Sequence, residues 1–109
     1  MLPKSHRLTK KRDFETVFKA GKGFKRDFLI VKVLKGQAKN SRFGFVVSKK
    51  VSAKAVVRNK VRRRLQQAAF LATEKMSTTA DVVFVALPNA TKKEFSEIKE
   101  TVAKVINAL

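Results

Sequence analysis

The feature that most constrains this chain is a strongly basic run from Lys49 to Ala69. Eight of the sixteen residues from Lys49 to Arg64 are lysine or arginine, and none is acidic. A block of like charges alone is typical of a disordered tail, but here apolar residues recur at helical spacing. At 100° per residue, one apolar set falls within about 80°: Val57, Val61, Leu65, Ala68 and Ala72. The run therefore predicts an amphipathic helix that starts between positions 55 and 57 and ends near Lys75.

The opposite side of this helix carries guanidinium and amide groups, between about 100° and 240° on the same wheel. These residues are Arg58, Asn59, Arg62, Arg63 and Gln66. A solvated surface helix is the ordinary alternative, but such helices usually carry neutralising acids four residues away, and this one has none. Arginine binds phosphate oxygens in pairs and stacks on bases, and asparagine suits a sugar hydroxyl or a base edge. We therefore interpret the helix as a nucleic-acid contact, with RNA and DNA both open.

The overall charge also indicates a polyanionic partner. The 109 residues include 26 lysines and arginines against 8 acids, a formal net charge of +18, and self-repulsion on this scale disfavours a compact chain. Nucleic acid is the first expectation and an anionic membrane surface the second. Positions 28–73 hold twelve basic residues and no acid, so one side of the molecule should be strongly positive. No apolar run could span a bilayer and no signal peptide is evident, so we expect a cytoplasmic protein.

The remaining patterns predict a single α+β domain over residues 1–109. Residues 1–7 should form a basic arm, followed by a helix over 10–20 with Thr9 as N-cap and Gly21 as its stop. Residues 21–26 are expected to be a connection. Apolar and β-branched runs predict strands over 28–34, 42–48 and 81–87, the first two paired as a hairpin and the last covered on both faces.

A capping box at Thr91 should open a final helix that packs on the sheet. Its apolar stripe consists of Phe95, Ile98, Val102, Val105, Ile106 and Leu109. The order helix, strands, helix, strand, helix is typical of a small two-layer sandwich.

No catalytic constellation is found along the chain. Asp13 and Glu15 would diverge by about 200° on a helix and are interpreted as solvated charges, and His6 has no evident partner. The absence of cysteine and the single histidine argue against thiolate and histidine-cluster metal sites, and no phosphate-loop or HExxH motif occurs. We expect no catalytic residue, metal site or cofactor in this chain, so any reaction would use groups supplied by a partner.

The expected first helix places Phe14, Val17 and Phe18 on one face. The two phenylalanines either pack in the core or line an exposed aromatic surface on which unpaired bases stack. The residues alone leave both alternatives open.

Several stretches together resemble one known family over nearly the whole chain. Residues 48–50 (SKK) followed by 55–65 (AVVRNKVRRRL) closely resemble the arginine-rich "RNR" signature of the bacterial ribonuclease P protein subunit. Residues 8–9 with 13–21 (DFETVFKAG), 42–50 (RFGFVVSKK) and 81–86 (DVVFVA) are similar to its first helix, the strand before its motif and its last strand. The spacing of Gly44 to the Ser-Lys-Lys triplet makes this signal much more specific than a charge count.

The resemblance implies an accessory subunit of the ribonucleoprotein that removes the 5′ leader from precursor tRNA. In that family the catalytic RNA supplies the active site and its magnesium ions, so ribonuclease P RNA and precursor tRNA are the expected partners, without a membrane or a protein-bound cofactor. The implied fold is ribosomal protein S5 domain 2-like, with a left-handed crossover around the arginine-rich helix, against the usual right-handed rule.

The family motif also implies site residues. The catalytic-RNA contacts would be Lys49, Lys50, Lys54, Arg58, Asn59, Lys60, Arg62 and Arg63. The leader, bound in a cleft between the first helix and the sheet, would contact Phe14, Phe18, Lys19 and Lys32, which favours the stacking alternative for the aromatic pair. The chain departs from the family where Gln66 replaces a usual arginine, and where 28–34 lacks a tyrosine. A ribosomal-protein-like RNA-binding module and a DNA-binding architectural protein are the competing hypotheses.

Overall fold

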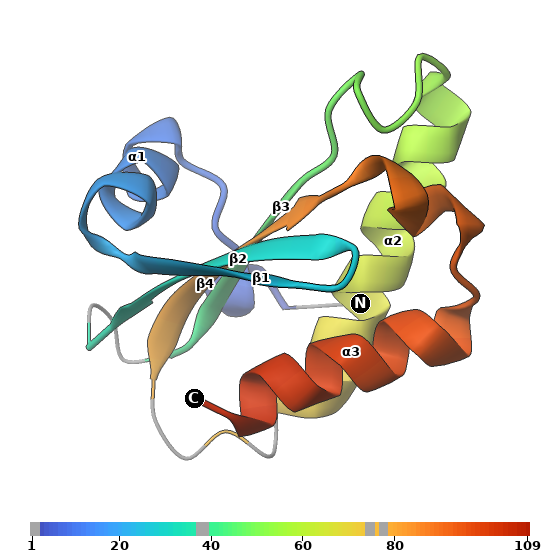
Figure 1. The fold of residues 1–109 in the computed structure, drawn as a ribbon. Coiled ribbons are helices and arrows are strands. Elements are labelled where there is room, and N and C mark those ends of the chain that lie inside the picture. The colour runs from blue at the N-terminus through green and yellow to red at the C-terminus, as the bar shows by residue number, and fades with distance from the viewer. Residues whose placement is uncertain (1–2, 37–39, 74–75, 77–78) are drawn as a thin grey trace.

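The computed structural model describes residues 3–36, 40–73, 76 and 79–109, and Figure 1 shows how their helices lie about a sheet. The α-helices are α1 (Lys11–Ala20), α2 (Ala55–Ala72) and α3 (Phe95–Asn107), and the short 3-10 helices are η1 (Lys4–His6) and η3 (Pro88–Lys92). The strands are β1 (Lys22–Arg26), β2 (Leu29–Lys35), β3 (Arg42–Val46) and β4 (Ala80–Ala86). The expected α+β class is confirmed.

The sheet has the strand order β1-β2-β4-β3. β4 lies antiparallel to β2 and parallel to β3, so the expected hairpin between β2 and β3 is wrong. The continuous apolar run of β4 is buried on both faces, with Val82 and Val83 both fully covered, as a central strand requires. α2 is the crossover between the parallel strands β3 and β4, and the left hand of this crossover stays a prediction.

β1 is a strand where the sequence predicted only a connection. It pairs antiparallel with β2 through a turn at Asp27, whose φ of 53° is left-handed. All five residues of β1 are exposed, so its sequence lacks the apolar alternation by which a half-buried strand is recognised. Pairing with β2, not burial, makes this segment a strand.

The main core lies on the face of the sheet covered by α2 and α3. Phe84 stacks between Phe43 and Phe45, at centroid distances of 6.4 and 5.8 Å. The stripe of α3 packs here as expected, with Ile98 and Val102 fully buried. On the opposite face, a smaller cluster forms around Leu8, Val17 and Val83. α1 therefore lies across the sheet from α2 and α3, as Figure 1 also shows.

Two expected helix caps are wrong. α1 begins at Lys11 with Lys10 as N-cap and no side-chain cap, so Thr9 does not cap it. Thr91 lies inside η3 and its hydroxyl donates to the carbonyl of Pro88, while Glu94 precedes the first residue of α3. Local hydrogen bonding by the threonine competes with capping of the later helix.

Gly21 does end α1, although its φ of −77° is not left-handed. A Cβ at this position would lie 2.5 Å from the carbonyl oxygen of Val17 and 2.8 Å from that of Val33. Glycine is therefore required because the end of α1 lies directly against β2.

The expected basic arm is instead packed along β3. Arg7 forms a parallel bridge with Phe43, and the backbone N–H of Leu8 donates to the carbonyl of Phe43 at 2.8 Å. His6 Nδ1 lies 2.7 Å from the carbonyl oxygen of Ser41, so the expectation that His6 lacks a partner is wrong. The backbone groups of the edge strand β3 recruit this segment; residues 1–2 lie outside the described part of the chain.

Candidate RNA interface

The basic helix docks by the stripe that the sequence predicts. Val61, Leu65, Ala68 and Ala72 are buried against the core, and Val57 is half-buried. The helix ends at Ala72, and the predicted end near Lys75 lies outside the described residues. Because the apolar stripe is used for packing, the guanidinium-rich side of α2 faces away from the core.

Two residues connect the loop before α2 to the rest of the protein. Val51 is 8% exposed and packs in the core. Nη1 of Arg58 donates to the carbonyl oxygens of Ser52 and Ala53, both at 3.0 Å. The loop lysines Lys49, Lys50 and Lys54 are exposed, so the loop presents cations from a fixed backbone. Part of the donor capacity of Arg58 is therefore used inside the protein.

Arg62 and Asn59 form a pair on the exposed side of α2. Nη1 of Arg62 donates to the amide oxygen of Asn59 at 2.7 Å. The pair borders a hollow of about 460 Å³, whose lining is Val56, Asn59, Arg62, Arg63 and Gln66. Val56 is 77% exposed, and no carboxylate lines this hollow. An anionic group with an adjacent apolar ring or sugar edge would fit this chemistry.

A second hollow, of about 330 Å³, opens on the side of α2 nearer to α3. Its lining is Lys60, Arg63, Arg64, Gln67 and Phe95. Nη1 of Arg64 donates to the carbonyl of Lys93 at 3.2 Å, which orients a guanidinium that the expected contact set omitted. Its only sequence signal was membership of the basic run. Arg63 lines both hollows, so it lies on the ridge between them.

The other expected contact set lies on α1 and on the face of the sheet that α1 partly covers. In β2, Val31 and Val33 point into the main core, so Lys32 between them points toward the α1 side. Phe14 is half-buried in the smaller cluster, whereas Phe18 is 41% exposed. Lys19, next along α1, is exposed. Within this pair, Phe14 therefore has a packing role and Phe18 presents the more exposed ring.

Gly44 explains how Phe14 can lie so close to the sheet. A Cβ at position 44 would be 2.5 Å from Cε1 and 2.6 Å from Cζ of Phe14. Real side chains essentially never approach this closely, so the ring rests on the bare backbone of β3. The requirement for glycine here links the strand before the basic loop to the aromatic pair on α1.

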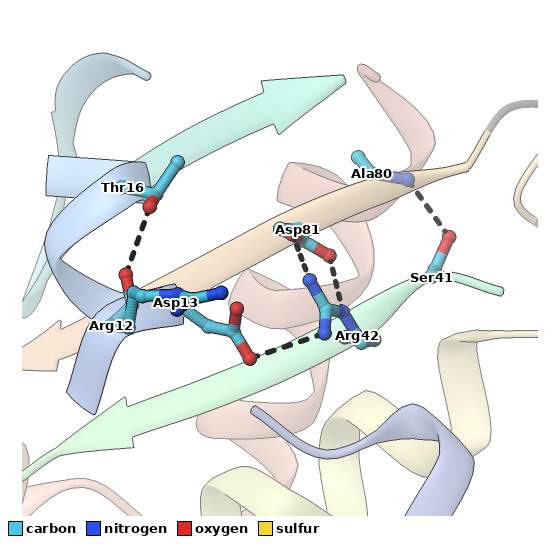
Figure 2. Close-up of polar contacts among 7 residues, drawn as sticks. All are labelled: Arg12, Asp13, Thr16, Ser41, Arg42, Ala80 and Asp81. Carbon is cyan, nitrogen blue, oxygen red and sulfur yellow. Dashed lines mark hydrogen bonds and ion pairs between the residues drawn. The ribbon is translucent and has the colours of Figure 1, made fainter. Parts of the chain in front are cut away.

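An ion cluster that sequence reasoning missed joins α1 to the sheet (Figure 2). Nε and Nη2 of Arg42 donate to the carboxylate of Asp81 at 2.9 and 2.7 Å, and Nη1 lies 3.3 Å from Oδ2 of Asp13. The hydrogen bond to buried Asp81 raises the pKa of Arg42 above its usual value. The expectation that Asp13 is a solvated charge is therefore wrong. The residues are too far apart in sequence for spacing to reveal the cluster, although an acid opening an apolar strand was a signal.

The described part of the chain contains no group of three or more metal-ligating side chains that could hold an ion. None of its helices is long and apolar enough to span a bilayer. These findings concern residues 3–36, 40–73, 76 and 79–109 alone.

Comparison with known proteins gives consistent matches along the chain. The family model of ribonuclease P matches residues 2–109. The ribonuclease P protein component of Alkaliphilus metalliredigens is 31% identical over 105 residues, covering 96% of this chain and 94% of the relative. That of Clostridioides difficile is 37% identical over 100 residues, covering 91% and 87%. Both support the ribonuclease P interpretation, not the ribosomal-protein-like one.

Comparison of structures agrees. The ribonuclease P protein of Thermotoga maritima superimposes with a TM-score of 0.84 at 25% identity, and the match covers 94% of this chain and 96% of that one. The overall fold of this chain is therefore one already seen in a solved structure. On the family match and the relatives together, this chain belongs to the family of the ribonuclease P protein component.

Proposed function

We propose that this protein docks on the catalytic RNA of ribonuclease P through α2 and its preceding loop, and holds the 5′ leader of precursor tRNA on the α1 side of the sheet. The two contacts would use different elements of one small domain. The protein would thereby bring substrate and catalytic RNA together without supplying reacting groups of its own.

The proposed docking on catalytic RNA rests on the exposed surface of α2, whose charged side chains are all positive. Its two hollows are lined by four cations and no carboxylate: Lys60, Arg62, Arg63 and Arg64. The loop adds Lys49, Lys50 and Lys54 from a backbone held by Arg58. Prearranged cations lose less conformational freedom on binding, so they favour a folded RNA whose phosphates have fixed positions.

The leader-binding part rests on the chemistry of the opposite face of the sheet. Phe18 offers an exposed ring on which an unpaired base could stack, an interaction that accepts any base. Lys19 and Lys32 would contact the leader phosphates. Phe14 would pack beneath this stacking surface, on its sheet side, and contribute the exposed part of its own ring.

The reaction itself is proposed to take place in the RNA partner. Family membership associates the chain with ribonuclease P. We propose that the catalytic groups and the magnesium ions belong to the RNA, and that the complex works in the cytoplasm. The contribution of the protein would be binding and orientation, which raise the effective concentration of substrate at the active site.

Site-specific crosslinking tests the division between the two contacts. The chain contains no cysteine, so single-cysteine variants can carry a photo-crosslinker: Gln66→Cys on α2, Glu15→Cys on α1, and Glu100→Cys on the exposed side of α3 as control. In the complex with precursor tRNA, the α2 probe should label the catalytic RNA and the α1 probe the leader. Labelling of the same RNA segment by both probes, or no more labelling than from α3, would contradict the proposal.

A further inference from the structure

Arg42 connects three elements of the fold: it lies on β3, pairs with Asp81 on β4, and reaches Asp13 in the first turn of α1. We propose that Arg42 is a positioning residue for leader recognition, because its hold on Asp13 fixes α1 and thus the rings of Phe14 and Phe18. This inference rests on the proposed leader-binding function of the α1 face.

The pair between Arg42 and Asp81 is internal to the sheet. The two residues are direct partners in the parallel register of β3 and β4, and Asp81 is only 3% exposed. Two parallel N–H to oxygen bonds fix both the position and the plane of the guanidinium. The remaining nitrogen, Nη1, is therefore a donor whose direction is set by the sheet, as Figure 2 shows.

This fixed donor holds the N-terminal half of α1. The C-terminal end of the helix is already placed by Gly21, which lies directly against the backbone of β2. Between the two ends, Val17 is the one residue of α1 that is fully buried. The ion pair at Asp13 thus acts on the half of the helix that carries Phe14, one residue before that ring.

Gly44 determines how closely α1 can approach the sheet. Arg42 and Gly44 are two residues apart on β3 and so face the same side of the sheet, where the ring of Phe14 rests on the bare glycine backbone. The carboxylate of Asp13 and the neighbouring ring of Phe14 therefore contact the same short stretch of β3. One contact draws α1 toward the sheet by charge, and the other limits its approach by contact of the ring with the backbone.

The first test compares Asp13→Ala with Glu15→Ala. Both variants remove one negative charge from α1, but Glu15 pairs only with exposed Lys11, at 3.9 Å. The measured quantity is the ratio of affinities of the assembled ribonucleoprotein for precursor tRNA and for leaderless tRNA. Asp13→Ala should reduce this ratio by about three- to fivefold, as expected for a partly exposed ion pair, whereas Glu15→Ala should leave it unchanged. Affinity for the catalytic RNA should be the same in both variants.

A second variant covers the case in which Asp13→Ala disturbs folding. Gly44→Ala keeps every charge but places a methyl group where the ring of Phe14 lies, so it should also lower the leader preference while leaving the affinity for catalytic RNA unchanged. Equal ratios for Asp13→Ala and Glu15→Ala would overturn the positioning role, as would a wild-type ratio in Gly44→Ala. If the wild-type complex itself shows no leader preference, the proposed leader-binding function fails, and the positioning role with it.

Discussion

Nη1 of Arg62 donates a 2.7 Å hydrogen bond to the amide oxygen of Asn59, one turn earlier on α2. Both side chains line the same hollow, so the bond orients the guanidinium toward the space that an RNA phosphate would fill. The family resemblance implies that both residues contact the catalytic RNA, which stays a prediction. The geometry adds that Asn59 can act through Arg62, by reducing the freedom that Arg62 loses on binding.

Replacing Arg62 should weaken docking in a salt-dependent way. We expect Arg62→Ala to lower the affinity for catalytic RNA by about 1–3 kcal/mol, the range for a charge-assisted contact. The dependence of log K on log salt should also flatten by roughly one unit, because one phosphate contact is lost. A filter-binding titration at several salt concentrations measures both quantities, and an unchanged slope would place Arg62 outside the interface.

Asn59→Ala should lower the affinity chiefly by releasing Arg62. In a double-mutant cycle, the effect of Asn59→Ala should be smaller in the Arg62→Ala background than in the wild-type protein. Asn107→Ala, which removes an exposed amide of α3 outside both hollows, is the control. Additive effects of Asn59→Ala and Arg62→Ala would mean that Asn59 contacts RNA independently.

Arg58 should act partly through the loop that it holds. In Arg58→Lys the charge remains, but the lysine side chain is one bond shorter, so its ammonium does not reach the position of Nη1, which donates to the carbonyls of both Ser52 and Ala53. We expect faster amide hydrogen exchange over residues 49–54 in the free protein and weaker binding of catalytic RNA, whereas Lys60→Arg should leave the exchange unchanged. Unaltered exchange in Arg58→Lys would show that Val51 alone fixes the loop.

Substitutions of the neighbouring residues Phe18 and Val17 on α1 should change different properties: leader binding for Phe18 and stability for Val17. Phe18→Ala should weaken leader binding by about 1–3 kcal/mol through lost stacking and barely change the melting temperature, because its ring is 41% exposed. Val17→Ala should mainly destabilise the fold, since Val17 is fully buried and its truncation would leave a cavity. Melting curves and leader-binding titrations separate the two effects, and a lowered melting temperature without weaker binding would assign Phe18 to the core.

Removing Arg42 should destabilise the protein because it leaves the buried carboxylate of Asp81 unpaired. We expect Arg42→Met to lower the free energy of unfolding by about 2–4 kcal/mol, below the fully buried limit because Arg42 is partly exposed. The double variant with Asp81→Leu should recover most of this loss, which denaturant unfolding can measure. If the double variant is as unstable as Arg42→Met, the effect lies in packing and not in the unpaired charge.

The pH dependence of this contribution follows from the raised pKa of Arg42. A raised pKa gives stability that is fully present below the unfolded-state value and lost only as the pH rises through the folded-state value. For an arginine both values lie in the strongly alkaline range. The stability difference between wild type and Arg42→Met should therefore be the same at about pH 8 and pH 9.5. A difference that shrinks over this interval would indicate that another group titrates.

The elements with strong internal periodicity could be predicted from the sequence. The stripes of α2 and α3 and the two-sided apolar run of β4 each specify how the element is buried, and all three are confirmed. β1 could not be predicted this way, since it is exposed along its length. The pairing of β3 with β4, in place of a hairpin with β2, depends on where α2 returns the chain, which no local pattern records.

In the candidate site, too, local patterns could be predicted from the sequence and tertiary contacts could not. The cations of α2 could be recognised because they lie close together in sequence and all fall outside the apolar stripe of the helix. The contacts that orient them, such as Arg64 to the carbonyl of Lys93, depend on tertiary structure. The cluster of Asp13, Arg42 and Asp81 joins residues from three distant segments, so it could only be found once the sheet was assembled.

Reconstitution with a bacterial ribonuclease P RNA tests the central claim most directly. The protein is added to the RNA at low magnesium concentration, the RNA without protein serves as the reference, and the release of the 5′ leader from precursor tRNA is followed. We expect the wild-type protein to restore cleavage and to bind precursor tRNA more tightly than leaderless tRNA in the assembled complex. No stimulation, together with equal affinity for tRNA with and without a leader, would contradict the account.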